Sequence, residues 1–349
     1  MSFGPPRCPN PTCIRHEQPS RDRIIRWGFF PARCREQLEQ RYRCKDCHTT
    51  FSRQTFRHDY RDRRPDCNAA LFELLTSGVG LRQSARVLKL GVTTVQKKMR
   101  KLSHTCRLLH QNLCTSLPPG RSYLLDEEES YEGASIRPLT LPILIEQSHW
   151  FVVATAVGSI RRLAPAGTAR RRRQDLDEQL HGKRPDESRQ VVTEVLQTLR
   201  QLTVGPIQLL TDEKSSYATV AREVFGSDVI HSTTAGSAPR TTRNPLFPIN
   251  ITIAMTRDNC GRLRRRSWLV SKLARWLDGQ MAIFTVFRNY VRQRFNRDKP
   301  DQTPAKLLGL MPRQLQPFEV VRWRQDWGSQ SVHPLSLCGD RAIAQGVSM

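Results

Sequence analysis

Two pairs of closely spaced cysteines near the start of the chain constrain its fold more than any other feature. The pairs are Cys8 with Cys13 and Cys44 with Cys47, and the strand-like run Ile24 to Phe30 lies between them. Short spacings of this kind let four thiolates bind one tetrahedral zinc ion, and a module of this size has too small a core to fold without one. We therefore predict a zinc ribbon over residues 1–58 with one structural Zn²⁺. The alternative is a set of unrelated reduced thiols.

The distribution of charge indicates where a polyanion would bind. The chain has 56 Lys and Arg residues against 32 Asp and Glu, a formal net charge of +24. Residues 1–120 carry a balance of +14 and residues 240–324 one of +13, whereas residues 121–239 carry −2. An excess this large favours nucleic acid, and we expect double-stranded DNA to contact the two basic regions. The weakly acidic centre is then a candidate for a metal-dependent site.

Residues 65–115 have the pattern of a helix-turn-helix. Asp66 is a candidate N-cap for a first helix over 68–75, and a second helix over 80–88 precedes a turn at Gly91. A basic third helix then begins at Thr93 or Thr94 and runs to Leu102, as in DNA-reading modules. The side chains expected to face DNA are Thr93, Thr94, Gln96, Lys97 and Arg100. The alternative is a basic helical hairpin used only for packing.

Residues 119–298 alternate between strand and helix patterns. The predicted strands and helices, in chain order, are strands 122–126, 138–145 and 150–160, helix 186–202, strand 206–212, helix 217–225, strand 229–232 and helix 250–266. This is the order of a ribonuclease H-like (RNase H-like) fold, in which the first and fourth strands are neighbours, so Asp126 and Asp212 would meet at one end of the sheet. Two close carboxylates repel each other, and Mg²⁺ relieves that repulsion. We therefore predict a site for two Mg²⁺ ions, as used in phosphoryl transfer.

Taken together, these modules predict a multidomain α+β protein. Two further segments lie outside their regular elements. Residues 161–185, with Arg170 to Arg173, are predicted to form a loop that either holds a DNA phosphate or is a mobile insertion. Residues 299–349 are expected to be a partly flexible C-terminal extension. The run Arg288 to Arg294 is predicted to form a phosphate-facing edge. Aromatic residues at helical spacing are predicted to be core contacts, namely Trp268, Trp276, Phe284, Phe287 and Tyr290.

Three sequence blocks resemble the insertion sequence 1 family of transposases. Residues 125–133 resemble the first catalytic block, with Asp126 on the first catalytic Asp, and residues 211–217 resemble the second, with Asp212 on the second Asp. Residues 257–267 resemble the basic helix of the third block, and with the ribbon and helix-turn-helix the resemblance covers roughly residues 8–297. It implies a metal-dependent transposase that cuts element ends and joins them to a target without a covalent enzyme intermediate, as a homo-oligomer on DNA.

The third catalytic position departs from the family pattern. These transposases normally carry a Glu there, whereas this chain has Asn250. The related insertion sequence 1595 family can use Asn at that position with a Lys or His further along, and Lys272 is the matching Lys; Asp258 is a fallback carboxylate. The resemblance implies Asp126, Asp212 and Asn250 as Mg²⁺ ligands, Lys272 as a further catalytic residue, and Arg262 and Arg265 as DNA contacts. If Asn250 marks a lost ligand, the chain is instead an inactive, transposase-derived DNA-binding regulator.

The sequence also predicts where in the cell the protein is located. The opening residues 1–10 contain no apolar signal core, and the most apolar stretch, residues 139–160, is interrupted by the polar residues 146–149. We therefore expect neither secretion nor a membrane span. A bacterial, cytoplasmic protein associated with the nucleoid is the expectation.

Overall fold

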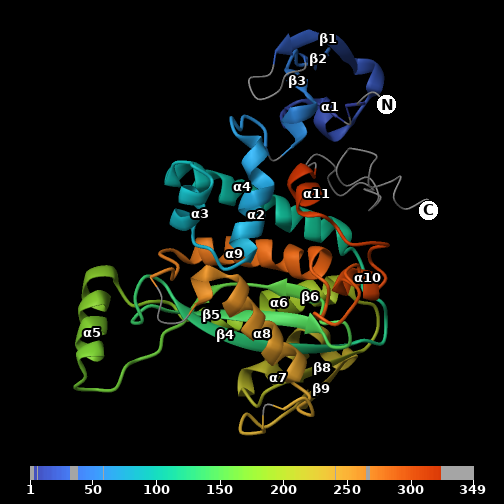
Figure 1. Ribbon diagram of the computed structural model, residues 1–349. Helices are drawn as coiled ribbons and strands as arrows, with labels where there is room; N and C mark the ends of the chain where they lie inside the picture. Colours follow the sequence, from blue (N-terminus) through green and yellow to red (C-terminus); the bar gives the residue numbers. More distant parts are fainter. Residues whose placement is uncertain are drawn as a thin grey trace.

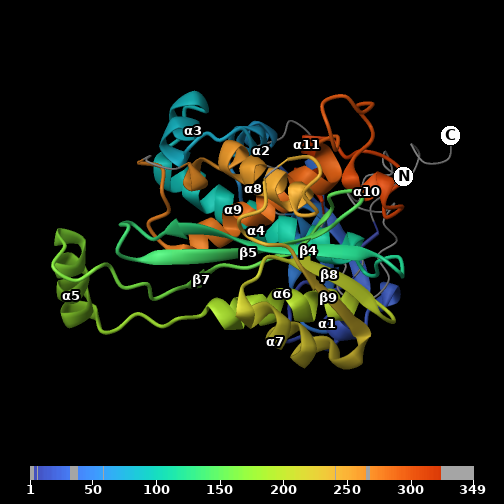
Figure 2. The same ribbon diagram turned by 90° about the horizontal axis from the view of Figure 1, so that it is seen from below.

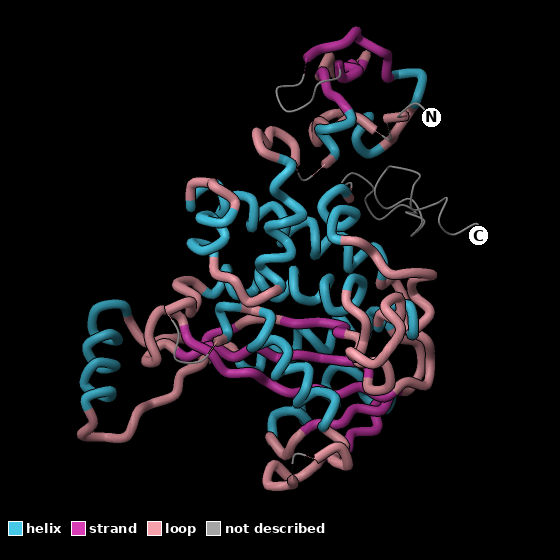
Figure 3. Tube along the Cα trace, in the orientation of Figure 1, coloured by secondary structure: helices cyan, strands magenta, loops and turns pink. Residues whose placement is uncertain are grey.

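The computed structural model describes residues 4–5, 7–31, 38–57, 59–239, 241–264 and 268–323. Within these residues the chain has one sheet of three strands, one sheet of six strands and the helices α1 to α11 (Figure 1). The small sheet lies at one end of the molecule, the large sheet lies towards the other end, and helices lie between them (Figures 1 and 3). The expected mixture of helices and strands is confirmed.

The N-terminal module contains a short antiparallel sheet. Its strands β1 (Ile24–Pro31), β2 (Leu38–Cys44) and β3 (Thr50–Ser52) follow one another in the sheet, and α1 (Ile14–Glu17) precedes them. The packed aromatic core consists of Tyr42, Phe51 and Phe56, with ring centroids 5.9 and 5.6 Å apart. A core of this size buries too little apolar surface to hold the module together alone.

Three helices follow where the helix-turn-helix pattern predicts them: α2 (Asn68–Thr76), α3 (Leu81–Val87) and α4 (Val92–Leu113). The predicted cap at Asp66 is wrong, because Asp66 pairs with Arg64 and α2 begins after a 3₁₀ turn. Helix α4 is longer than predicted, and one face of it is buried along its whole length. The buried residues recur at helical spacing and include Val95, Met99, Leu102, Cys106, Leu109 and Leu113.

That buried face joins the helix-turn-helix to the rest of the protein. It packs on α9 (Ala274–Val286), and the two helices approach closely where Gly279 meets Ser103: a Cβ at Gly279 would lie 3.1 Å from the Ser103 hydroxyl. His110 hydrogen-bonds the Tyr290 hydroxyl at 2.9 Å and the Val153 carbonyl at 3.0 Å. The core of α4 is therefore continuous with the core over the large sheet.

The large sheet has the strand order β6-β5-β4-β8-β9, with β7 also paired to β5. Its strands are β4 (Ser122–Tyr131), β5 (Pro138–Glu146), β6 (Val152–Thr155), β7 (Gly158–Ser159), β8 (Ile207–Thr211) and β9 (Val229–Thr233). The first three strands are antiparallel, whereas β4, β8 and β9 run parallel. The predicted adjacency of the first strand and the strand that ends before Asp212 is confirmed.

Helices cover both faces of this sheet (Figure 2). Alternate residues of β4 point to opposite faces, so Leu124 packs with α8 (Phe247–Asn259) and α9, while Leu125 packs with α6 (Ser188–Leu202) and α7 (Ser215–Phe225). Strand β5 is buried at every position. Unlike the small N-terminal module, this sheet has an apolar core on both faces that can hold it together without a metal ion.

Two segments differ from the sequence prediction. The predicted loop over 161–185 contains the helix α5 (Ala169–His181), capped by Thr168, and two extended connections carry it away from the body (Figure 3). The C-terminal extension is packed as far as the structure describes it: α10 (Pro304–Leu307) and α11 (Pro317–Arg322) bury Ala305, Val320 and Trp323 in the main core. The rest of that extension, 324–349, lies outside the described residues.

The segment around α9 corrects two further predictions. Phe284 and Tyr290 are buried as expected, but Trp268 is 94% exposed and is no core contact. Arg288 lies in a π-helical turn, Phe287–Val291, and is fully buried with its guanidinium on the carbonyls of Gln293 and Arg294, so it is not a phosphate-facing edge. None of the described helices is long and apolar enough to cross a membrane.

Candidate metal centres and DNA interface

The four cysteines predicted to bind zinc converge in the ribbon. The Sγ atoms of Cys8, Cys13, Cys44 and Cys47 all lie within 4.8 Å of one another. Cys8 and Cys47 are 3.5 Å apart, and Cys13 and Cys44 are 3.8 Å apart. Four thiolates around zinc at about 2.3 Å are separated by roughly 3.8 Å, so the arrangement fits a tetrahedral ion. Among the described residues, this is the one cluster of three or more such ligands found.

Electrostatics around the cluster also suit a cation. Asp46, between the second pair of cysteines, is bridged by Arg23 and by Arg15, which follows the first pair. Hydrogen bonds from Arg23 and Arg15 lower the pKa of Asp46 to about 2. Burial raises the pKa of Cys8, whereas contacts with Thr49 outweigh burial and lower the pKa of Cys47 to about 6. The ionic bridge ties one cysteine pair to the other.

The two predicted catalytic aspartates follow the segment where β4 pairs with β8. In this parallel pair, Tyr123 is opposite Leu209 and Leu124 is opposite Leu210, where the pairing ends. Asp126 and Asp212 each lie two residues further along the chain, and both are half-buried. Strand β4 does not end at Asp126 as predicted but continues to Tyr131, so only Asp212 stands just beyond a strand end.

Ionisable groups on α7 and α8 interact with the acids of β4 and with Asp212. Burial first, and then the charges of Glu127, Asp126 and Asp212, raise the pKa of the buried Tyr217 on α7. On the opposite face of β4, Arg257 of α8 donates to the buried Glu128 at 2.8 Å, and its pKa is raised by that hydrogen bond and by the charges of Glu128 and Asp126. Asp126 is two residues from Glu128 and therefore lies on the side of β4 that α8 covers.

Two glutamates after Asp126 have structural roles that the sequence analysis did not predict. Glu128 is 2% exposed and holds α8 to β4 through Arg257. Glu127 accepts hydrogen bonds from Thr140 at 2.9 Å and from Lys214 at 2.8 Å. Because Lys214 also donates its backbone N–H to Asp212, at 3.1 Å, the Glu127–Lys214 pair holds the loop of Asp212 against β4. The alternating burial of strand residues was the available signal.

The remaining predicted catalytic residues are placed differently from one another. Asn250 lies half-buried in the first turn of α8, two turns before Arg257 and so on the stripe that faces β4. Lys272 adjoins Ser271, whose carbonyl accepts the Gly133 N–H, and Gly133 is roughly 20 Å along the strand direction from Asp126. Asn250 is therefore on the helix that covers the Asp126 side of β4, whereas Lys272 lies away from Asp126. Asp258 is exposed.

The predicted DNA contacts on α4 lie on its outer side. Thr93, Thr94, Lys97 and Arg100 are exposed, and Gln96 is half-buried. Gln96, Arg262 and Lys272 line a cavity of about 580 Å³ between the helix-turn-helix and the α8–α9 connection. Arg262 is half-buried against Met99 and Ser271, and burial lowers its pKa to about 10, so it could reach DNA only through this cavity. Arg265 lies outside the described residues.

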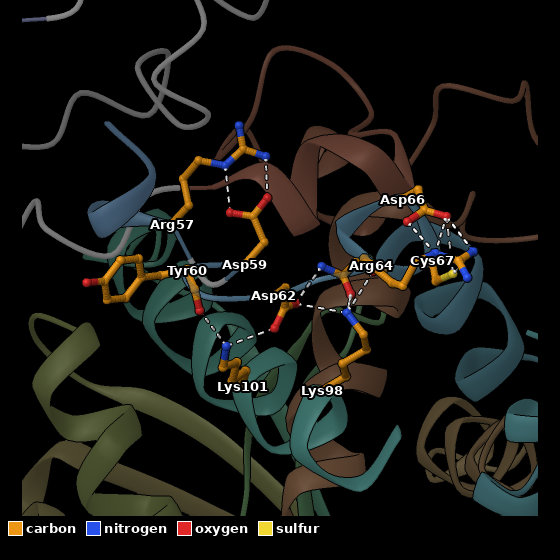
Figure 4. A network of polar contacts seen from close by, with 10 residues as sticks. Arg57, Asp59, Tyr60, Asp62, Arg64, Asp66, Cys67, Lys98 and Lys101 are labelled. Carbon is orange, nitrogen blue, oxygen red and sulfur yellow. Dashed lines mark hydrogen bonds and ion pairs between the residues drawn. The ribbon is translucent and has the colours of Figure 1, made fainter. Parts of the chain in front are cut away.

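Other lysines of α4 hold the linker from the ribbon instead of facing solvent (Figure 4). Lys98 is 5% exposed and donates to Asp62, the Arg64 carbonyl and Asn68 at 2.9, 2.9 and 2.8 Å. Lys101 donates to Asp62 as well, at 2.9 Å. These contacts fix the start of the linker relative to the helix that carries the exposed basic residues.

Comparisons with known proteins find a partial sequence relative and distant solved structures. The insertion element iso-IS1N protein InsA of Shigella dysenteriae is 35% identical over 60 residues, which are 17% of this chain and 63% of that protein. No protein-family model matches. The cryoEM structure of the simian T-cell lymphotropic virus intasome in complex with PP2A regulatory subunit B56 gamma aligns with 69% of this chain and 72% of the matched chain, at 12% identity and a TM-score of 0.28. At that TM-score the match carries no argument about the fold.

Proposed function

We propose that this protein is a DNA transposase of an insertion-sequence element, which cuts the element ends and joins them to a target by metal-dependent phosphoryl transfer. The observation that carries the proposal is the parallel pairing of β4 with β8, because Asp126 and Asp212 each lie two residues beyond its last pair, Leu124 and Leu210. Likeness over 60 residues to an insertion-element protein supports the same conclusion. Such an enzyme would work on the nucleoid in the bacterial cytoplasm.

The proposed catalytic region is an RNase H-like domain over residues 119–298. Two half-buried carboxylates, with the amide oxygen of Asn250 as a neutral third donor, form a set of hard oxygen ligands that suits two Mg²⁺ ions. When bound, Mg²⁺ activates the attacking oxygen and stabilises the leaving oxygen of phosphoryl transfer. The chain's own contribution is to hold those ligands, through the Glu127–Lys214 pair and the Glu128–Arg257 pair.

DNA binding is assigned to the two N-terminal modules, the zinc ribbon over 1–58 and the helix-turn-helix over 65–115. Four exposed side chains of α4, Thr93, Thr94, Lys97 and Arg100, would contact bases or phosphates. Because transposition joins two ends, a homo-oligomer on DNA is part of the proposal.

A second function is a DNA-binding regulator without catalysis. It is favoured by Asn250, which offers no negative charge at the third position, and by the distance of Lys272 from the acids. Both functions include zinc and DNA binding, so only strand cleavage separates them.

The test uses the zinc-loaded full chain and the DNA that flanks its gene, with Mg²⁺ or Mn²⁺. Asp126→Asn and Asp212→Asn should each lower cleavage by a factor on the order of 1,000 while leaving DNA affinity nearly unchanged, because each removes an anionic ligand but no DNA contact. Glu213→Gln, an exposed acid next to Asp212, is the matched control and should stay active. Wild-type protein that binds the ends and never cuts would establish the regulator instead.

Asn250 is tested separately. Asn250→Ala should strongly reduce cleavage if its amide oxygen is the third ligand. Full activity in that variant would reject Asn250 and turn attention to Asp258.

A further inference from the structure

The sheet of the ribbon has one packed face and one exposed face. Tyr42 and Phe51 point into the module, but β1 carries four consecutive exposed residues, Arg26 to Phe29. Trp27 is 45% exposed and Phe29 is 65% exposed. Strand β1 lies at the end of the molecule farthest from the large sheet (Figure 1). Aromatic side chains gathered on such a surface indicate an interaction site.

Arginines of β2 stack on the aromatic residues of this face. The guanidinium of Arg43 lies 4.5 Å from the centre of the Trp27 ring, and that of Arg41 lies 5.1 Å from the centre of the Phe30 ring. Arg41 and Arg43 are two residues apart on one strand, so they share a face, opposite to that of Tyr42. The surface therefore carries two aromatic–arginine pairs in a row.

A bulge in β1 shapes this surface. The pairing register shifts between Arg26 and Phe29, and Gly28 between them has φ +72°, a conformation that favours glycine. Gln40 donates to the Gly28 carbonyl at 2.7 Å and holds the bulge in place. Beyond the bulge Phe30 is opposite Glu39 and Phe29 is opposite Gln40, so Phe30 shares the face of Arg41 and Arg43 whereas Phe29 lies on the other side of the strand.

We propose that this face, formed by Trp27, Phe30, Arg41 and Arg43, binds unpaired nucleotides of DNA. Flat rings stack on free bases whatever their sequence, and guanidinium groups beside them neutralise phosphates. The bases of an intact duplex are already stacked on each other and cannot use such a surface. The inference rests on the proposed action on DNA and deepens it: the ribbon would hold separated strands at the element end, while α4 contacts the duplex beside them.

The experiment measures affinity by fluorescence anisotropy for the zinc-loaded full chain. One probe is a blunt duplex of about 20 base pairs, and the other is the same duplex with a tail of about eight unpaired nucleotides, a length within the footprint of such surfaces. The tail should tighten binding of the wild-type protein about 10-fold or more. Trp27→Ala should lose most of that preference, with little change for the blunt duplex, because stacking of one base is worth a factor of about 5 to 100.

The matched control is Phe318→Ala. Phe318 on α11 is 47% exposed and has Arg322 5.7 Å from its ring, so it repeats the same chemistry elsewhere on the surface. This variant should keep the affinities of the wild-type protein for both probes. Zinc content is measured for every variant, and if Trp27→Ala loses zinc, then Trp27→Leu and Arg43→Gln replace it.

Four results would overturn the inference or its premise. Equal affinity of the wild-type protein for both probes, or an unchanged tail preference in zinc-loaded Trp27 and Arg43 variants, would reject the nucleotide-binding face while the proposed transposase stands. If the Trp27 and Arg43 variants no longer self-associate but still prefer the tailed duplex, the face is a contact between protein chains. Failure of the wild-type chain to bind even the duplex would reject the proposed function itself.

Discussion

The two candidate metal centres are built in opposite ways. In the ribbon, four thiols come from two short loops of a small module whose packed aromatic core is three rings. In the large sheet, Asp126 and Asp212 are far apart in the sequence, and the proposed site depends on the pairing of β4 with β8 inside a core that is packed on both faces. We therefore expect loss of zinc to unfold the ribbon, whereas loss of magnesium should stop catalysis and leave the fold unchanged.

The largest expected effect is that of zinc removal. Chelation, or Cys44→Ser, should unfold the ribbon, because binding of structural zinc supplies about 10 kcal/mol or more to such modules. The helices and the large sheet should keep their structure. Metal analysis with limited proteolysis checks this, and a ribbon that stays protease-resistant without stoichiometric zinc would contradict it.

The second prediction concerns the two aspartates of the large sheet. Asp126→Asn and Asp212→Asn should lower cleavage strongly but leave the melting temperature of the zinc-loaded chain in magnesium-free buffer unchanged or slightly higher. The reason is that each substitution removes one of two neighbouring like charges that repel each other. Thermal unfolding of the two variants beside Glu213→Gln checks this. A clear drop in melting temperature for the aspartate variants alone would mean that the acids are structural.

A third prediction concerns the adjacent lysines Lys97 and Lys98. Lys98→Met should lower the free energy of unfolding by about 3 kcal/mol, because it leaves Asp62 buried with Lys101 as its remaining ionic partner. Lys97→Met, the exposed control, should leave stability unchanged and weaken DNA binding. Equal stability of the two variants in chemical denaturation would reject the proposed role of the linker network.

The effect of Lys98→Met should also depend on pH, because Lys98 pairs with the carboxylate of Asp62. Burial alone would raise the pKa of Asp62, but hydrogen bonds from Lys101 and Lys98 lower it overall. A carboxyl with a lowered native pKa stabilises the fold above its ordinary pKa of about 3.9, and that stability is lost as the pH falls through the native value. The gap between wild type and Lys98→Met should therefore be largest near neutral pH and shrink below about pH 4.

The smallest expected effect on stability is that of Lys214→Met. The Lys214–Glu127 pair is partly exposed, so its loss should change the free energy of unfolding by less than about 1 kcal/mol. If the pair positions the loop of Asp212, the variant should need several-fold more Mg²⁺ for half-maximal cleavage. An unchanged Mg²⁺ requirement would mean that the Lys214–Glu127 pair does not help to position Asp212.

The sequence predicted the local features better than the distant ones. The spacing of Cys8, Cys13, Cys44 and Cys47 sufficed to predict their cluster, because short loops dictate where their side chains lie. The order of strands sufficed to predict that β4 and β8 are neighbours. It could not predict that β4 continues past Asp126, because a run of acids does not look like a strand until Arg257 and Lys214 are there to pair with Glu128 and Glu127.

Tertiary contacts explain the other differences. Arg288 was taken for a surface residue because nothing local predicts a π-helical turn with carbonyls that solvate a buried guanidinium. The cap at Thr168 was a readable signal for α5, but a segment with four consecutive arginines looked like a loop. Lys98 and Lys97 are indistinguishable in the sequence, and only the linker at Asp62 separates their roles.

The most direct test of the central claim asks whether Asp126 and Asp212 hold the same ion. Fe²⁺ can replace Mg²⁺ at such sites, and with ascorbate and peroxide it cuts the polypeptide next to where it is bound. In the zinc-loaded full chain with end DNA, we expect cuts near both residue 126 and residue 212. Both cuts should disappear together in Asp126→Asn and in Asp212→Asn, and both should remain in Glu213→Gln. Cutting at one segment only, or cuts that survive both aspartate substitutions, would contradict a shared site.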